Sequence, residues 1–499
     1  MSDRLRPANF SLHLDNYPNS NYNSDCFTSF SLGPRTAFRM RRYVIFISAG
    51  LSLFMYSMDS TMVAVAFPNL IKDFGTNVLW AAWTISIYLV AVTSVMPLMG
   101  NLSDSVGRKK IFLVSLFLFT GSSLACGLAP NIHSLVVFRF FQGLGGAAFL
   151  PTAAGIVSDQ FPEHRERAIG LFTTINQLGG VIGPNVGGWI VSRYSWRSIF
   201  YINIPIGIVL IALISLFLDG SEVRSRLHID AGGASLFFGT ILFLMLGLNL
   251  LAESLSLSSL VLTFAFLAVS FSLFFLFFRQ EKRDPNPILD MTFLKTKPFL
   301  AANLFNMITG AGMQGICAFI PLYATSVFGL STLASGMVLT PRSLAMIPAS
   351  VVTSFMLWRT GYRKPMVLGL VIMSFSVLLL GQDPGLWRAI GISFGIAESI
   401  ALILLFLGVG CGTAFPASNN ACIELMPEKA ATITGVRGMF VYVGGALGIS
   451  FTTIVLHLSS TPALGFRIAF ISFGLGLLFT IPSVFLLPIG KKKEIRSSG

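Results

Sequence analysis

Long apolar runs separated by short polar loops fill the chain from Tyr43 to its end. A helix that rises about 1.5 Å per residue needs about 20 apolar residues to span roughly 30 Å of hydrocarbon, and each run approaches or exceeds that length. Membrane barrel strands would be shorter and would alternate apolar with polar residues, which these runs do not. The pattern predicts fourteen transmembrane helices, at residues 43–66, 80–102, 111–129, 134–158, 167–191, 199–218, 231–251, 259–278, 299–327, 333–357, 365–381, 392–415, 431–457 and 464–488.

Composition supports a multi-pass membrane protein of the all-α class. The chain is 54% hydrophobic and 11% charged, with a mean hydropathy of +0.76, which is far from the composition of a soluble globular protein. Its five cysteines form no C-x-x-C pair, so we expect them to be apolar packing residues without a metal or disulfide role. No cofactor is expected.

The net charge of +13 is explained by the placement of the basic residues. Of the 34 Lys and Arg residues, 26 lie on the tails and on the loops between even and odd spans or at the span ends beside them, 5 lie on or next to the opposite loops and 3 lie deeper inside spans. By the positive-inside rule both termini are cytoplasmic, in a cell membrane. The excess charge is therefore topological, and nucleic acid is excluded as a partner.

An internal repeat divides the predicted helices into two sets of six. The loop 100–110 and the loop 354–364 align when Gly107 is placed opposite Gly361, although Trp358 then stands where the first copy has Asp104. Helices 1–6 and 9–14 form the two bundles, and helices 7 and 8 form an inserted hairpin. The expected organisation is a disordered tail at 1–42, a bundle at 43–218, a linker with the hairpin at 219–298, a bundle at 299–488 and a tail at 489–499. Met40, directly before two arginines and the first span, is an alternative start.

The loop from Gly100 to Lys110 resembles the signature loop of the major facilitator superfamily, G-x-L-x-D-x-x-G-R-[KR]. Glycines permit a tight turn between membrane helices, and the basic residues hold the loop at the cytoplasmic surface. The resemblance implies a conformational latch between the two bundles, formed by Gly100, Asp104, Gly107 and Arg108. The alternative is a plain turn with topogenic charges. Serines flank Asp104 where relatives often carry Ala and Arg, which weakens the expected latch.

Three further motifs resemble those of the 14-helix drug:proton antiporters in this superfamily. The first span carries Met58-Asp-Ser-Thr61 and then Val65-Ala-Phe-Pro68, similar to L-D-x-T-x-x-x-x-A-L-P. The fourth span carries Arg139-Phe-Phe-Gln-Gly143, similar to R-x-x-Q-G. The fifth span resembles the antiporter motif G-x-x-x-G-P-x-x-G-G, which implies a close-packed helix between the bundles that restricts proton leak. The motif residues are Gly179, Gly183, Pro184, Gly187 and Gly188.

Depth along the membrane predicts that Asp59 and Arg139 meet. Asp59 lies 16 residues from the start of the first span, or roughly 24 Å along its axis, and Arg139 lies 5 residues from the outer start of the fourth, or roughly 8 Å. Both are therefore at a similar level in the outer half of the first bundle. Burial favours the protonated carboxyl and a nearby arginine favours the ionised one, so the pair predicts a proton switch. The alternative is that Asp59 only bonds locally within its own helix.

Three other residues are candidates for the substrate cavity. Gln142 lies one turn from Arg139 on the same helical face. Arg342 follows Pro341 in the tenth span, and Glu398 is an acid about two turns into the twelfth. A Glu398 that reaches solvent is an equally good interpretation.

The function expected from the sequence is secondary active export by alternating access, in which protons are exchanged for amphipathic small molecules, as in multidrug efflux. A dedicated exporter of one metabolite, peptide or siderophore is the alternative within transport. From another class, a transport-inactive membrane sensor or a membrane enzyme remains open, although the chain has no nucleotide-binding loop, no nucleophile elbow and no metal-spaced cluster. The expected partners are the substrate, protons and the bilayer, with the protein a monomer.

Overall fold

The computed structural model describes residues 34–162, 165–220, 231–253, 257–283, 296–391, 394–425 and 430–487, and all regular secondary structure within these ranges is helical. The predicted all-α class is confirmed. The chain divides into two units, Met1–Tyr43 and Val44–Gly499, and the packing described below lies within the second. The predicted disordered tail, apart from the residues that open the first helix, and the C-terminal tail lie outside the described residues.

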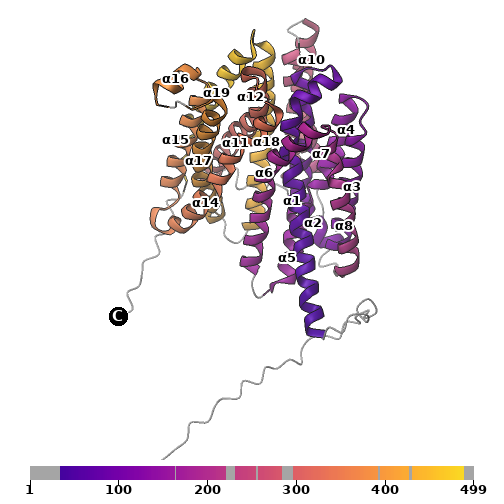
Figure 1. Cartoon of the computed structure of the whole chain (residues 1–499). Helices are drawn as coiled ribbons and strands as arrows, with labels where there is room; N and C mark the ends of the chain where they lie inside the picture. The colour runs from indigo at the N-terminus through magenta and orange to yellow at the C-terminus, as the bar shows by residue number, and fades with distance from the viewer. Residues whose placement is uncertain are drawn as a thin grey trace, which may run out of the picture. The chain divides into compact units, whose positions relative to one another are not determined.

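The helices of the first part of the chain, up to the predicted hairpin, run side by side in Figure 1. They are α1 (Pro34–Phe74), α2 (Val78–Val106), α3 (Arg108–Gly127), α4 (Ile132–Gly146), α5 (Phe149–Gln160), α6 (Arg165–Arg193), α7 (Ser198–Tyr201) and α8 (Asn203–Phe217), followed by the hairpin helices α9 (Ala231–Glu253) and α10 (Leu257–Glu281). Below, α1 to α8 are called the first half.

The helices after the hairpin are called the second half. They are α11 (Lys297–Cys317), α12 (Ile320–Phe328), α13 (Thr332–Met337), α14 (Thr340–Thr360), α15 (Arg363–Leu380), α16 (Pro384–Ala389), α17 (Ile396–Glu424), α18 (Ala430–Leu458), α19 (Pro462–Phe479) and α20 (Ile481–Val484). Several predicted spans are two helices in series, and proline explains many of the breaks. Proline lacks a backbone N–H and fits best in the first turn of a helix, where α12, α14 and α20 each carry one.

Within the described residues, eleven helices are long and apolar enough to cross a membrane. A helix is also present at the three other predicted spans, as α6, α9 and α14. The chain is a multi-span membrane protein, and the count of fourteen stays a prediction.

The same neighbour relationships recur in the two halves. In the first, α2 packs on α4, and α3 packs on α4 and α8; in the second, α14 packs on α17, and α15 packs on α17 and α19. The aligned turns agree as well, since Gly107 has φ 107° and Gly361 has φ 69°. Positive φ favours glycine because it has no Cβ. The internal repeat in the sequence therefore corresponds to repeated packing, while the domain boundaries remain predictions.

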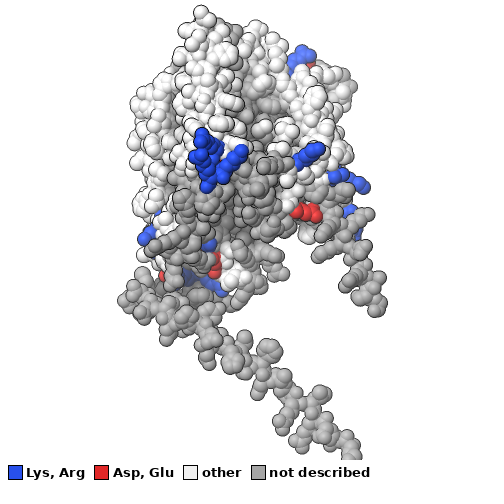
Figure 2. Space-filling view, turned by 180° about the vertical axis from the view of Figure 1, so that it is seen from behind, with Lys and Arg blue, Asp and Glu red and all other residues white. Residues whose placement is uncertain are grey.

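Several sets of contacts among the described residues join the halves. α2 packs along α18, α6 packs on α13 and α14, and α9 packs on both α2 and α18. Glycines allow the closest approach: a Cβ on Gly336 of α13 would lie 2.5 Å from the carbonyl oxygen of Pro184 in α6. Much of the remaining surface is uncharged, as the face in Figure 2 shows, and large side chains such as Phe271 and Phe479 are exposed where lipid would cover them.

We expect Gly444→Val to destabilise the second half. The contact between α11 and α18 is the most extensive among the described helices, and a Cβ on Gly444 would overlap the carbonyl oxygen of Met307. Overpacking of this kind costs about 1–3 kcal/mol. Thermal unfolding of purified protein in detergent should show a lower melting temperature than for Gly438→Val on the same helix, where an added Cβ meets nothing within 4 Å. Equal melting temperatures would contradict the described packing.

Candidate functional site

The predicted pair of Asp59 and Arg139 is present as a buried ion pair. Asp59 of α1 is 1% exposed and Arg139 of α4 is fully buried, with Arg139 Nη1 2.7 Å from Asp59 Oδ2. Charges in hydrocarbon are stable only when they are paired and hydrogen-bonded, so their meeting at this level explains how both are accommodated. The alternative of a purely local role for Asp59 does not describe this geometry.

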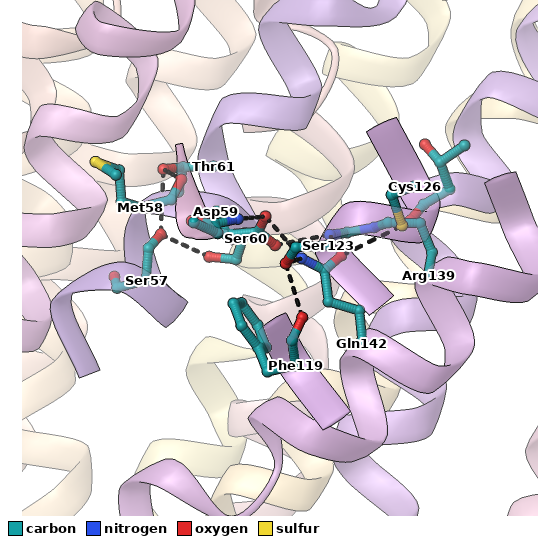
Figure 3. A network of polar contacts seen from close by, with 12 residues as sticks. Ser57, Met58, Asp59, Ser60, Thr61, Phe119, Ser123, Cys126, Arg139 and Gln142 are labelled. Carbon is teal, nitrogen blue, oxygen red and sulfur yellow. Dashed lines mark hydrogen bonds and ion pairs between the residues drawn. The ribbon is translucent and has the colours of Figure 1, made fainter. Parts of the chain in front are cut away.

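The second carboxylate oxygen has two further donors (Figure 3 draws the centre of the network). Gln142 Nε2 donates to Asp59 Oδ1 at 3.0 Å, and Asn203 Nδ2 of α8 donates to the same oxygen at 2.8 Å. Gln142 and Asn203 are both fully buried. The Asp59 carboxylate therefore accepts three hydrogen bonds from two other helices, one of them from Arg139.

The guanidinium of Arg139 is held from several sides. Its Nε donates to the backbone oxygen of Thr84 in α2 at 3.0 Å, and its Nη1 also donates to Gln142 Oε1 at 2.6 Å. Its Cζ lies 4.1 Å from the centroid of the Tyr88 ring, which is within cation–π range. Among the described residues, Arg139 Nη2 has no hydrogen-bond partner, so one donor of the network is unused.

Glycines on α4 explain how the arginine reaches the site. A Cβ on Gly143 would lie 2.7 Å from the backbone oxygen of Tyr88, and one on Gly146 would lie 2.9 Å from the ring of Tyr56. Small residues at these positions bring α4 close against α2 and α1. The R-x-x-Q-G stretch therefore combines two polar side chains on one helical face with the glycine that allows close packing.

Gln142 lies within the ion-pair network, whereas the sequence pattern had assigned it to the substrate cavity. Besides Asp59 and Arg139, it contacts α3, since its Nε2 donates to Ser123 Oγ at 2.8 Å. Ser123 in turn donates to the backbone oxygen of Phe119 at 2.8 Å. Gln142 thus bonds to both members of the ion pair and links them to a third helix.

The other two predicted cavity residues lie elsewhere. Arg342 is the third residue of α14, is partly buried, and lies close to Cys317 and Cys411. Glu398 is exposed in the first turn of α17. The position of Glu398 agrees with the solvent-reaching interpretation and does not support its assignment to a cavity. The boundary explains the difference, because α17 begins at Ile396, four residues after the predicted start of that span.

The predicted latch is described only in part. Gly107 ends α2 and precedes α3, and Arg108 Nη1 bonds to Asp159 Oδ2 of α5 at 2.6 Å and to the backbone oxygen of Gly155. Arg108 therefore ties the start of α3 to α5 within the first half. The side chain of Asp104 and the surroundings of Gly100 lie outside the described residues.

The antiporter motif of α6 forms a close helix contact with α1. A Cβ on Gly179 would lie 2.6 Å from the backbone oxygen of Phe54, and one on Gly183 would lie 2.9 Å from that of Met58. Gly187 follows one turn later against Met62, and Gly188 faces the other way, toward Thr332 of α13. Pro184 lies inside the helix and lacks a backbone donor. One face of α6 therefore packs within its own half and another contacts the second half.

Comparison with known proteins identifies the family. The model of the Major Facilitator Superfamily matches residues 49–283, 231–449 and 302–498. The chain belongs to the Major Facilitator Superfamily. This confirms the family expected from the signature loop and the three motifs.

Two individual relatives and one solved structure are similar to this facilitator superfamily member over most of its length. It is 28% identical over 425 residues to the multidrug transporter protein MdtP of Bacillus subtilis (strain 168), covering 84% of this chain and 76% of the relative. It is 33% identical over 404 residues to multidrug resistance protein 3 of the same strain, covering 80% and 77%. The crystal structure of a POT family transporter in complex with 5-aminolevulinic acid shares its fold, with a TM-score of 0.66, 16% identity and coverage of 89% of this chain and 95% of that one.

We expect Arg139→Leu to destabilise this facilitator superfamily protein more than the double variant Asp59→Asn/Arg139→Leu. Removing one member of a buried pair leaves an uncompensated charge and costs about 3–5 kcal/mol, whereas removing both leaves none. Thermal unfolding in detergent measures the difference, with Arg193→Leu as the control because Arg193 is exposed. If the double variant is no more stable than the single variant, the charge balance of the pair does not stabilise the bundle.

Proposed function

We propose that the protein is a secondary active exporter that exchanges protons for amphipathic small molecules by alternating access. The buried Asp59 and Arg139 pair is the observation that carries the proposal. A carboxylate whose counter-ion is a movable side chain can accept a proton when the two separate. The names of the two Bacillus subtilis relatives support drug efflux as the direction and purpose of transport.

Burial gives the pair a gating role in this proposal. At 1% and 0% exposure, neither Asp59 nor Arg139 reaches water in this conformation. Proton uptake therefore needs a rearrangement that opens the site and separates the pair, and the same rearrangement changes which side of the membrane is accessible. One charge moving down a potential of 100 mV supplies about 2.3 kcal/mol, which is about a fiftyfold concentration ratio for a neutral substrate.

Two other elements have proposed roles in the same cycle. The latch at the predicted cytoplasmic end, formed by Gly100, Asp104, Gly107 and Arg108, is one of them, and the Arg108 contacts with α5 fix the start of α3 within the first half. The close contacts of Pro184 and Gly188 in α6 with α13 support a seal against proton leak between the halves. We further propose fourteen spans, both termini in the cytoplasm and a monomeric transporter.

We expect Asp59→Asn to abolish proton coupling. The test uses proteoliposomes with ethidium as the transported probe, a pH gradient and no membrane potential. A gradient of about one pH unit supports about a tenfold ethidium ratio for one-for-one exchange, and this ratio should fall toward one in the variant because no carboxyl group accepts the proton. Both the ethidium ratio and the accompanying proton flux are measured.

Asp73→Asn is the matched control for this experiment. Asp73 lies on the same helix as Asp59, but its side chain is 48% exposed, and asparagine keeps an oxygen that accepts the hydrogen bond from Trp196. Coupling should therefore persist in Asp73→Asn. Undiminished proton flux in Asp59→Asn would remove Asp59 from the mechanism.

The breadth of the substrate range separates a multidrug pump from a dedicated exporter. A strain lacking the gene should become sensitive to several chemically unrelated amphipathic compounds if the protein is a multidrug pump. Sensitivity to a single compound, or accumulation of a single metabolite, would favour the dedicated exporter. Unchanged growth on the whole panel, together with no proton flux in liposomes, would contradict transport by either route.

A further inference from the structure

Asn203 is a polar residue of the ion-pair site that the sequence motifs did not identify. It is the first residue of α8, whose sequence is otherwise almost wholly apolar, and it is fully buried. Its Nδ2 donates to Asp59 Oδ1 at 2.8 Å, and among the described residues its Oδ1 has no hydrogen-bond partner. A buried amide with one unused acceptor is unusual, because buried polar atoms are normally paired.

We propose that Asn203 is the positioning residue that holds the Asp59 carboxyl in both of its protonation states. In the ionised state the Asn203 amide N–H donates to the carboxylate, as observed. In the protonated state the unpaired Asn203 Oδ1 can accept the new carboxyl O–H after the amide rotates, since asparagine carries both a donor and an acceptor. The inference rests on the proposed proton coupling and assigns Asn203 a role within that site.

The helix that carries Asn203 distinguishes it from the other donors. Arg139 and Gln142 both lie on α4, so a movement of α4 withdraws both from Asp59 together. Asn203 lies on α8 and is free of that constraint. When the pair separates, Asn203 is therefore the donor that can remain with the carboxyl group.

The α7 to α8 segment is anchored firmly enough to keep Asn203 in place. Trp196 Nε1, just before α7, donates to Asp73 Oδ2 at the end of α1 at 2.8 Å. The Tyr201 hydroxyl donates to the backbone oxygen of Gly127 in α3 at 2.8 Å. Gly207, one turn after Asn203, packs so closely that a Cβ there would overlap Thr120 of α3. Asn203 is thus fixed against both α1 and α3, which is the preorganisation that a positioning residue needs.

The test compares Asn203→Leu with wild type by infrared difference spectroscopy of the full protein in liposomes at a series of pH values. The carboxylic-acid C=O band that disappears in Asp59→Asn reports protonation of Asp59, and no substrate is needed. The bond that Asn203 donates to the ionised carboxylate is charge-assisted and about twice as strong as the neutral bond that it would accept from the protonated carboxyl. Loss of both bonds therefore disfavours the ionised state more, so half of the band should appear at a pH higher by up to about one unit. The pH profile of ethidium export should move in the same direction.

Asn303→Leu is the matched control. Asn303 is a buried asparagine of α11 whose Nδ2 bonds to Phe299 of its own helix at 3.0 Å and does not contact Asp59. In this variant the Asp59 carboxylic-acid band should appear at the same pH as in wild type. Asn203→Ala is the second variant if the leucine protein does not fold, and the same upward shift is expected because alanine also lacks the amide.

The outcomes separate the inference from the proposed function. An Asp59 band that stays at the wild-type pH in a folded Asn203 variant overturns the positioning role and leaves Asn203 with a packing role only. A shift of equal size in Asn303→Leu also overturns it, because the effect would then be general. Wild-type protein with no Asp59-dependent band at any pH overturns the proposed proton coupling itself, and the role of Asn203 with it.

Discussion

The cost of burying charge among apolar helices is the constraint on which the rest of the first half depends. Asp59 and Arg139 are both within 1% of complete burial, and each would be strongly destabilising alone. Their hydrogen bonds come from α1, α2, α4 and α8, and Gln142 adds α3. Five helices therefore meet at one pair of charges. Their relative positions are specified by directional bonds, which apolar packing in a membrane does not provide.

Close backbone packing follows from the same constraint. Short polar side chains such as Asn203 and Ser123 can bond across helices only where the helix axes approach each other. Glycine permits that approach, and it is found beside the polar residues: Gly143 follows Gln142 directly, and Gly207 lies one turn beyond Asn203. The glycine-rich motifs and the charged network are consequently two parts of one arrangement.

Sequence reasoning found the charged part of the site and missed an uncharged part. Asp59 and Arg139 were predicted to meet because intramembrane charges are rare and the helical rise fixes their depth. Asn203 carries no charge, so a search for charged residues at similar membrane depth does not find it. The signal in the sequence was the single amide of Asn203 directly before the apolar stretch 204–217, with no other candidate site residue beside it. Its partner on α1 becomes visible only when α8 is placed against α1.

Boundaries explain the other differences between expectation and structure. Glu398 was expected two turns inside a span, but α17 begins only two residues before it, because a hydropathy window does not see where the backbone turns. Gln142 was placed on the correct helical face, since a spacing of three residues fixes the face, yet the face alone did not say whether a cavity or the ion pair occupies it. Helical periodicity predicts which way a side chain points from its helix. Which residue it contacts depends on how the helices pack.

The location of the ion pair within one half determines how its state can reach the other half. Arg139 lies over the ring of Tyr88, and Tyr88 stacks on Tyr56 with ring centroids 6.1 Å apart. Tyr56 in turn lies beside Tyr442 of α18, a helix of the second half that also packs along α2. A displacement of the guanidinium removes its contact with Tyr88, the first of three tyrosines between the ion pair and α18. The ion pair is thus linked to the contact between the halves through uncharged side chains, of which Tyr88 and Tyr56 are stacked.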